Sequence, residues 1–537
     1  METKMLASLE NISFGMKITI SLLGLLIYLG YRLATKNFDY WQKRGVKFLK
    51  PVPVFGSAPS IYMMKEHFFQ FLQRAYRENE NEPFVGYFSG TTPNLMIIDP
   101  ELIKRIFVKD FSHFIDHSFK VCEEADPLQA LNLFNLQGQR WKEMRTKLIP
   151  TFTSGKIKAM FPLMQECTEQ FDQHLNELAD SKEIFEAKDI AGRLFTDIIG
   201  STSFGIKCNS IKNPDNDFRR MVKKLLGANF IQVIKLVIVM FLPEIAMKFK
   251  LGFLDKEVTE FFKKLTKDMV EKRKKDGIVR RDFLQLLIEL KDKGSVAIDE
   301  DDEDKHLNVS NDNASSKTPF KFDDLDLAAQ TTVFFLAGFE TSSTLICFAL
   351  LELAMNPDVQ RKAQLEIDEC LAQNDGKVTY EALRGITYLE WILKETLRKY
   401  PPASVHGRVC TKKYVIPDTD VTVEKGMIIA IPNHALQNDP KYFADPDRFD
   451  PERFGDEELM KKNQYIYTPF GEGPRQCIGN RFAMLQSQLA LFTFLRKYTV
   501  GKCSKTIYPV NFHPVQFTLT SKDGVWLKLE KRNCNDQ

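Results

Sequence analysis

One cysteine, Cys477, lies in a glycine-rich turn just before a long apolar segment. Gly473 precedes it and Gly479 follows it, and glycines allow tight turns and a close approach of the backbone to a large flat group. The first amides of the helix predicted after Gly479, together with Arg475, are expected to lower the pKa of the thiol. A thiolate is both a nucleophile and a metal ligand. These residues alone leave three interpretations of Cys477: a nucleophile, a metal ligand or a buried unreactive thiol.

Two adjacent polar residues, Glu340 and Thr341, interrupt a strongly apolar stretch. Residues 323–357 are apolar nearly all round, which predicts one long helix in the centre of the core. Within it, Gly338 lowers helix stability by about 1 kcal/mol relative to alanine and lets a small molecule lie against the backbone. The Thr341 hydroxyl is able to bond the carbonyl one turn earlier, and Glu340 offers a carboxylate for proton transfer.

The spacing F-x-x-G-x-R-x-C-x-G resembles the haem-binding loop of the cytochromes P-450. Its positions are filled by Phe470, Gly473, Arg475, Cys477 and Gly479. In that family the cysteine thiolate is the axial ligand of the haem iron. The resemblance therefore implies that Cys477 binds the iron of haem b (iron protoporphyrin IX), with the other four residues shaping the cofactor-binding loop.

Further marks of the same family occur in the family's order. Ala337–Thr341 (AGFET) matches its oxygen-activation motif, with Glu340 and Thr341 as the implied catalytic pair. Glu395 and Arg398 match the E-x-x-R pair of the K helix and, at i and i+3, share one helix face. Arg453 matches the third member of that charge cluster. Buried charges are costly unless fully bonded, so this cluster is interpreted as a structural lock and not as catalysis.

Haem propionates are anionic and need hydrogen-bond donors. Trp141 and Arg145 lie one turn apart on a predicted helix, so that the indole N–H and the guanidinium point the same way. Arg408 and Arg475 match propionate-binding positions of the family. Where relatives often carry an arginine before that helix, this chain has His117, which is expected to replace it or to be a surface residue.

The resemblance covers nearly the whole chain and implies a mainly α-helical cytochrome P-450 fold, with a large helical domain around a central I helix and a small β-rich part. The implied reaction is an NADPH-dependent monooxygenation that inserts one atom of O2 into an apolar organic substrate. Substrate contacts are expected from the central helix, from the segment after the K helix and from the segment before Trp141, namely Phe119, Phe334, Phe335, Ala337, Ser404, Val405 and His406. Several segments look most like arthropod microsomal members associated with detoxification.

No dinucleotide fingerprint or flavin domain occurs in the chain, so electrons are expected from a separate NADPH-cytochrome P-450 reductase, with cytochrome b5 as a further donor. The expected docking surface is a basic face that includes Lys142, Lys147 and Lys461. A formal net charge of +3 is too close to balance for a nucleic-acid binder. Nine scattered cysteines without a C-x-x-C pair argue against a disulfide scaffold or a structural zinc site.

The N-terminus differs from the body. Residues 12–31 are apolar and long enough to cross a bilayer as a helix, and basic residues follow the span. By the positive-inside rule, these place the rest of the chain in the cytosol, which favours an anchor in the endoplasmic reticulum membrane over a cleaved signal peptide. The predicted organisation is an anchor at 1–33, a basic, proline-containing spacer at 34–56 and a catalytic domain at 57–537.

The body is predicted to be mostly helical, for example over 148–178, with strands at Asn94–Ile98 and Met427–Ile431. The acidic stretch at 295–319 is predicted to be a disordered surface loop. The apolar stretch Phe230–Met247, which Lys235 and Pro243 interrupt, is either a core helix or a hairpin that dips into the membrane.

Three alternative functions remain open at this point. A hydroxylase of endogenous hormones or lipids would use the same residues. A haem-thiolate isomerase would work without O2 or reductase, but such relatives tend to lack the acid–threonine pair. A haem-thiolate protein that only sequesters ligands would show binding without turnover.

Overall fold

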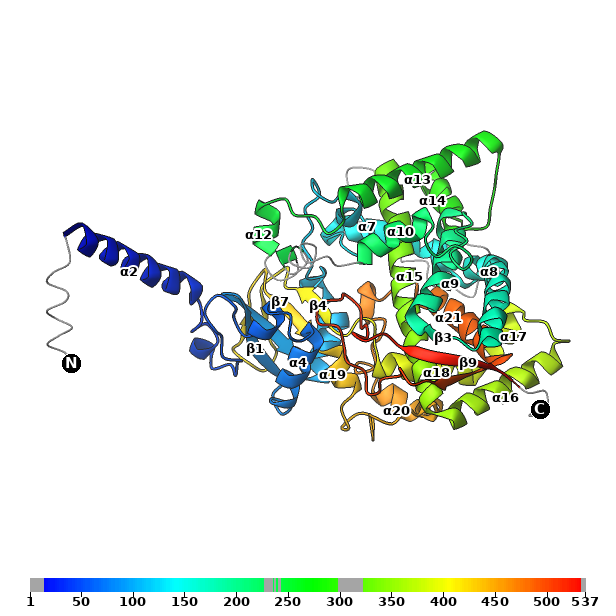
Figure 1. The fold of residues 1–537 in the computed structure, drawn as a ribbon. Coiled ribbons are helices and arrows are strands. Elements are labelled where there is room, and N and C mark those ends of the chain that lie inside the picture. Colours follow the sequence, from blue (N-terminus) through cyan, green and yellow to red (C-terminus); the bar gives the residue numbers. More distant parts are fainter. Residues whose placement is uncertain (1–13, 227–234, 236–237, 240–242, 298–321, 533–537) are drawn as a thin grey trace.

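The N-terminal helix α2 (Phe14–Ala34) projects from the body as a separate rod (Figure 1). The computed structural model describes residues 14–226, 235, 238–239, 243–297 and 322–532. No residue of α2 is buried, and its mean hydropathy of 1.6 makes it a candidate membrane span. Within the described residues, this helix covers the predicted stretch from Phe14 on and ends three residues beyond its predicted last residue, Tyr31.

The body is built around the long helix α15 (Asp324–Met355), which runs through its centre (Figure 1). Helix α15 is also long and apolar enough to span a membrane, but 61% of its apolar stretch is buried inside the fold, as expected for a core helix. Asp323 caps its N-terminus by accepting bonds from the amides of Leu325 and Asp326. The sequence predicted this helix to within two residues at each end.

Other helices surround α15, and several contact it directly, among them α9, α13, α18 and α21. The longer ones are α4 (Phe68–Arg77), α7 (Gly138–Leu148), α8 (Ser154–Ser181), α9 (Ala187–Ile199), α10 (Asp217–Leu226), α13 (Lys256–Asp276), α14 (Phe283–Lys293), α16 (Pro357–Gln373), α18 (Thr387–Lys399) and α21 (Asn480–Leu495). The shorter ones are α3 (Pro59–Tyr62), α5 (Pro100–Lys104), α6 (Pro127–Ala130), α12 (Pro243–Lys248), α17 (Tyr380–Gly385), α19 (Asn433–Gln437) and α20 (Glu457–Lys462).

The strands form three small sheets. The largest has the order β1-β2-β7-β4 and consists of β1 (Phe84–Ser89), β2 (Thr92–Ile97), β7 (Ile428–Ile431) and β4 (His406–Val409). A second sheet has the order β3-β9-β8 and consists of β3 (Ile184–Glu186), β9 (Trp526–Lys531) and β8 (Tyr498–Lys502). The third pairs β5 (Tyr414–Val415) with β6 (Thr422–Val423). Strands β2 and β7 confirm the two strands that the sequence predicted.

Two hydrophobic cores correspond to the helical and the β-rich parts. The larger core surrounds α15 and includes α8, α9, α13, α18 and α21. The smaller core lies on the β1-β2-β7-β4 sheet and includes α4 and α5. Cys410, just after β4, belongs to the smaller core, while Val405, just before β4, packs against both cores. The arrangement confirms a mainly helical fold with a small β-rich part.

Two predicted segments differ from the structure. The helix predicted over 148–178 is divided at Pro150, because α7 ends at Leu148, a 3-10 turn covers Ile149–Phe152 and α8 starts at Ser154. The predicted spacer at 34–56 is docked onto β1: the Leu49 amide bonds the Gly86 carbonyl at 2.9 Å. It therefore behaves as part of the body and not as a free spacer.

The two remaining segment predictions fall mainly outside the described residues. These are the acidic loop, of which only residues 295–297 are described, and most of the apolar stretch Phe230–Met247. The last residues of that stretch form α12, on which Ile245 and Met247 are exposed.

Candidate active site

The loop around Cys477 is a tight turn that only glycine permits at one position. Gly473 has a φ of +71°, and a Cβ there would lie 1.9 Å from the carbonyl oxygen of Phe107. The Cys477 amide donates to the Phe470 carbonyl at 2.9 Å, which closes the turn. Among the eight cysteines in the described part of the chain, Cys477 is the exposed one. The turn therefore presents a single sulfur at the start of α21.

The protonation of Cys477 differs in part from the prediction. Protein atoms surround the Cys477 sulfur although the side chain stays accessible to solvent, and the resulting desolvation raises the pKa of the thiol. This outweighs two effects that lower the pKa, a hydrogen bond from the Gly479 amide and the charge of Arg145. The amide at the helix start contributes as predicted, but the contributing arginine is Arg145 and not Arg475. The prediction of a lowered pKa is therefore wrong for the polypeptide alone, and a bound metal ion is needed to deprotonate the thiol fully.

Arg475 points away from the sulfur because its guanidinium is bound by backbone carbonyls. It donates to Ile115 at 2.8 Å and to Leu136 at 2.7 Å, and it lies 4.0 Å from the centre of the Trp141 ring. Arg475 thus joins the Cys477 turn to the segment before α7 and to α7 itself. Burial lowers its pKa to about 9, with Arg408 and Arg145 contributing in the same direction.

Three arginines and a histidine form a group of basic side chains next to the Cys477 turn. In addition to burial, the charges of Arg408 and Arg145 lower the pKa of Arg475, and the charges of Arg408 and Arg475 lower the pKa of His117, so these side chains lie close together. Arg408 is buried and donates to Nδ1 of His117 at 3.0 Å, while its buried Nε has no hydrogen-bond partner in the described structure. Asp116 is the carboxylate within reach of this group, 3.5 Å from Arg475. An anionic ligand bound here would offset the largely buried positive charges of this group.

His117 does not replace an arginine as a cation. Its imidazole accepts a hydrogen bond from Arg408, stacks on Phe134 at 4.5 Å between ring centres, and has a pKa well below the ordinary value because of burial and the neighbouring arginines. A neutral acceptor orients Arg408 but adds no charge. His117 is half-buried and uncharged, so it belongs to the basic group without adding a positive charge to it.

The charge cluster predicted from E-x-x-R is formed in full. Arg398 donates to both carboxylate oxygens of Glu395, and both side chains are fully buried. Arg453 lies 3.4 Å from Glu395 and donates to the carbonyls of Ala444 and Asp445. The charges are therefore paired and bonded, as a buried cluster requires.

This cluster is connected to the Cys477 turn. Arg398 donates to the backbone carbonyl of Gln437 at 3.0 Å, and the side-chain oxygen of Gln437 accepts from the amide of Thr468 at 3.1 Å. Thr468 also bonds Asn433 through its hydroxyl at 3.0 Å. Through Gln437 of α19, the buried charges hold Thr468, the residue at which the Cys477 turn begins.

The central helix exposes one short surface. Ala337 is exposed and Thr341, one turn later, is half-buried, although most of α15 around them is buried. The Thr341 hydroxyl donates to the Ala337 carbonyl at 2.7 Å, as predicted from the sequence. Side chains at i and i+4 lie on the same helix face. Ala337 and Thr341 therefore form one small surface, apolar at Ala337 and polar at the Thr341 hydroxyl.

Glu340 lies on a different side of α15 from Thr341. Its Oε1 accepts from Lys188 Nζ and from the Thr518 hydroxyl, both at 2.6 Å, whereas its Oε2 is buried and has no hydrogen-bond partner among the described residues. No hydrogen bond between Glu340 and Thr341 occurs in the described structure. The acid is therefore held by residues far away in the sequence, and neither Lys188 nor Thr518 was predicted.

A second unpredicted residue joins the two central helices. Gln486 on α21 donates to the carbonyl of Gly338 at 3.1 Å and to the hydroxyl of Ser342 at 2.7 Å. It links the helix that follows Cys477 to the turn that contains Ala337 and Thr341. A glutamine in an apolar helix gives no sequence signal that identifies its partner.

The predicted substrate-contact residues fall into different environments. Phe335 is fully buried among the rings of Phe204, Phe218, Phe262 and Phe339, and Phe334 packs on Phe152 and Phe283. The rings of Phe334 and Phe335 therefore pack against other aromatic rings inside the protein, whereas Ala337 is exposed.

The predicted residues after the K helix are mostly bonded within the protein. Ser404 is buried and its carbonyl accepts from the His434 amide, while Val405 is half-buried. His406 Nε2 bonds the carbonyl of Thr468 at 2.7 Å, and burial lowers the pKa of His406 to about 4. His406 therefore supports the start of the Cys477 turn as a neutral side chain.

Phe119 belongs to an exposed aromatic group. Its ring centre lies 5.8 Å from that of Phe134 and 5.8 Å from that of Phe517, and both neighbours are exposed. Phe517 belongs to the segment between β8 and β9, which the sequence did not associate with the site. Exposed aromatic rings from two distant segments form a surface suited to apolar ligands.

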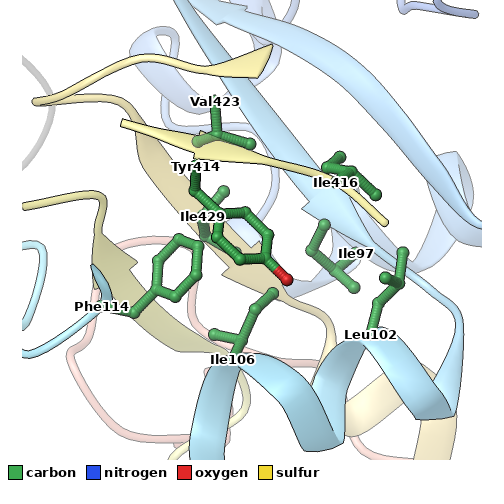
Figure 2. A pocket seen from close by; sticks show the side chains of 8 residues that line it. All are labelled: Ile97, Leu102, Ile106, Phe114, Tyr414, Ile416, Val423 and Ile429. Atoms are coloured by element: carbon green, nitrogen blue, oxygen red, sulfur yellow. The ribbon is translucent and has the colours of Figure 1, made fainter. Parts of the chain in front are cut away.

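An apolar cavity in the smaller core is not a ligand site. Figure 2 shows side chains that converge on it from β2, α5 and the strands around β6, with Tyr414 and Phe114 at one side. Its volume of about 10 Å³ is no more than one water molecule needs, and its lining is apolar. It is a small packing defect.

The residues around Cys477 fit an iron porphyrin. The thiol at the start of α21 would bind the iron, Gly473 and Gly479 carry no side chain that would obstruct a flat ring, and the basic group would provide charges and the unpartnered Arg408 Nε–H for the propionates. Ala337 and Thr341 provide the exposed surface on the central helix. The site thus defines a protein of the haem-thiolate class.

Comparison with known sequences agrees with this class. The family Cytochrome P450 matches residues 46–527. Cytochrome P450 9e2 of Blattella germanica is 40% identical over 523 residues, which cover 94% of this chain and 96% of the relative. Cytochrome P450 6k1 of Blattella germanica is 36% identical, with 95% and 96% covered, and Cytochrome P450 6a2 of Drosophila melanogaster is 35% identical, with 95% and 98% covered. The chain belongs to the cytochrome P450 family and is a haem-thiolate monooxygenase.

Proposed function

We propose that this protein oxidises apolar xenobiotics, such as plant toxins or insecticides, at a haem whose iron is bound by Cys477. The observation that carries the proposal is the presentation of one exposed sulfur at the start of α21, beside a group of basic side chains. When bound, the haem supplies reductive activation of O2, one atom of which enters the substrate while the other is reduced to water. The insect relatives support a detoxifying role over a hormonal one.

The protein's own residues hold the cofactor. Gly473 and Gly479 keep the turn close to the ring, and Phe470 accepts the Cys477 amide bond that closes it. Arg145 and Arg408 bind the propionates, with Trp141 beside them. Arg475 and His117 act indirectly: Arg475 fixes the turn to α7, and His117 orients Arg408.

Proton transfer is the task of α15. Thr341 bonds the Ala337 carbonyl and so places its hydroxyl on the exposed face of the helix. Glu340 keeps Oε2 free of hydrogen bonds, which makes that oxygen the atom able to accept and return a proton. The presence of both residues favours O2 activation over an isomerase.

The apolar substrate binds against Ala337 and the aromatic rings of Phe119, Phe134 and Phe517. Phe134 and Phe517 are exposed and Phe119 is half-buried in contact with both, which supports a site that accepts flat apolar molecules without a fixed set of polar contacts. This favours varied xenobiotics over one hormone or lipid.

The proposed location is the endoplasmic reticulum membrane, with α2 as the anchor and the body in the cytosol. The exposed apolar surface of α2 and the exposed Ile245 and Met247 of α12 support membrane contact. The proposed electron donors are NADPH-cytochrome P450 reductase and cytochrome b5. Lys142 and Lys461 are exposed and suited to an acidic partner, whereas Lys147 donates to the Gly294 carbonyl at 2.8 Å.

The test uses the full chain in membranes with reductase and NADPH, and a panel of plant toxins, insecticides, steroids and fatty acids. Product that contains one atom from labelled O2, with toxins or insecticides turned over fastest, supports the proposal. Preferred turnover of a steroid or fatty acid contradicts the substrate class. Spectral binding without product indicates a sequestering protein, and product without NADPH or O2 indicates an isomerase.

A further inference from the structure

Glu340 is held by residues from two separate elements. Lys188, near the start of α9, and Thr518, in the segment between β8 and β9, both donate to Oε1 at 2.6 Å. Lys188 also donates to the Thr520 hydroxyl at 2.8 Å. Together, Lys188, Thr518 and Thr520 form what we call the Glu340 clasp. It fixes one carboxylate oxygen and leaves the other without a partner.

The clasp lies largely within the protein. Glu340 is 9% exposed and Thr518 3% exposed, and the Lys188 side chain is 21% exposed. A carboxylate in such surroundings requires a charged partner, because an unpaired buried charge is strongly unfavourable. Two charge-assisted hydrogen bonds on Oε1 also fix the direction of Oε2. The position of the proton-carrying oxygen therefore depends on side chains outside α15.

The same segment also carries an exposed aromatic residue of the proposed substrate surface. Phe517, next to Thr518 in the chain, is exposed and its ring lies against that of Phe119. One residue further, the Thr518 hydroxyl is buried on Glu340. The exposed Phe517 ring and the hydroxyl that bonds Glu340 therefore belong to adjacent residues.

We propose that Lys188, Thr518 and Thr520 are positioning residues that orient Glu340 for proton transfer and couple its orientation to contacts made by Phe517. The inference rests on the proposed role of Glu340 in O2 activation. Each proton that Glu340 gives up from Oε2 is replaced by one from water, so the clasp residues keep their own protons. Electrons come from NADPH, as in the established reaction.

The first test compares Thr518→Val with Thr422→Val. Both changes replace a hydroxyl by a methyl group, but Thr422 lies in β6, in the third sheet. A positioned acid or base accelerates a reaction by about 10²–10⁴-fold. Thr518→Val is expected to lose part of this positioning, and so to lower the product formed per NADPH on the order of tenfold. Released hydrogen peroxide is expected to rise in proportion and the solvent isotope effect to increase, while Thr422→Val matches the wild type.

The second test separates charge from packing at Lys188. Lys188→Met is expected to lower product per NADPH at least as much as Thr518→Val, and Lys188→Arg, which keeps a cationic donor, is expected to restore most of it. If Lys188→Met does not fold, Thr520→Val, which removes only the outer hydroxyl, is expected to give an intermediate decrease. Wild-type product per NADPH and isotope effect in Thr518→Val, or in Thr520→Val, overturn the proposal.

A third measurement needs no turnover. Denaturant unfolding of Thr518→Val, Glu340→Gln and the double variant is expected to be non-additive, because the two side chains are bonded. Additive changes contradict the clasp itself. This result is independent of the proposed function, which fails instead if the wild-type protein gives no thiolate-type haem spectrum.

Discussion

Arg398 donates to both carboxylate oxygens of Glu395, at 2.7 and 2.9 Å, with neither side chain exposed to solvent. The same guanidinium bonds the carbonyl of Gln437, whose side chain holds the Thr468 amide. The buried ion pair is thus connected through Gln437 to the start of the turn that carries Cys477. Its effect on function is expected to come through the shape of that turn.

Removal of one partner of the buried Glu395–Arg398 ion pair is expected to destabilise the protein strongly. Arg398→Leu leaves the Glu395 carboxylate buried without its bidentate partner, which corresponds to about 3–5 kcal/mol of unfolding free energy. Denaturant unfolding and haem content at purification measure the two consequences. The matched control is Lys158→Leu, which removes an exposed ion pair with Glu381 and is expected to leave the unfolding free energy nearly unchanged, because exposed ion pairs contribute little. Equal effects of the two changes would contradict the proposed lock.

The Cys477 turn is expected to tolerate a methyl group at one glycine and not at another. In Gly473→Ala the new Cβ would meet the Phe107 carbonyl and the residue would keep a positive φ, so the turn must open and haem binding is expected to be lost. In Gly479→Ala the nearest atom is Phe152 Cε1 at 3.6 Å, an ordinary contact. Haem absorbance per protein measures both variants. Full haem content in Gly473→Ala would show that the turn is not held as described.

The basic group is expected to determine how firmly haem is retained. Arg408→Leu removes a buried charge and the unpartnered Nε, so haem is expected to dissociate faster and to be partly lost at purification. The control is Arg361→Leu, an exposed arginine on α16. Transfer of haem to an apoprotein acceptor measures the rate. An unchanged rate in Arg408→Leu excludes it as a propionate ligand.

Stability is expected to decrease in mild acid because two buried histidines stay neutral in the folded protein. Burial lowers the pKa of His406 to about 4 and that of His434 to about 3, from 6.5. Below pH 6.5 the unfolded chain therefore binds protons that the folded chain does not, so the unfolding free energy falls as the pH falls towards 4. Each histidine contributes about 1.4 kcal/mol per pH unit in that window. His406→Gln is expected to remove one part of this slope in denaturant unfolding at several pH values, and an unchanged slope contradicts the assignment.

The sequence predicted the elements whose signals are local. The central helix, two strands, the E-x-x-R pair and the Thr341 bond to Ala337 follow from periodicity and from spacing within one turn. Contacts between distant segments were not predictable in this way. Lys188 and Thr518 lie 152 and 178 residues from Glu340, and only the packing of α9 and the C-terminal segment brings them to it.

The same reason explains why Arg475 does not lower the pKa of the Cys477 thiol and why His117 is uncharged. Arg475 is two residues from Cys477 in the chain, but its direction is decided by the carbonyls of the segment before α7. His117 lies where a cation was expected, but three neighbouring basic groups and burial keep it neutral. Position in a motif predicted which residues gather at the site, and not which way each side chain points.

The central claim is that the Cys477 sulfur binds haem iron, and the most direct measurement is the difference spectrum of the reduced protein with and without carbon monoxide. The wild type and the control Cys503→Ser are expected to give the band typical of a thiolate ligand, and Cys477→Ser is expected to lose it. A Cys477→Ser protein that keeps the full thiolate band would contradict the account.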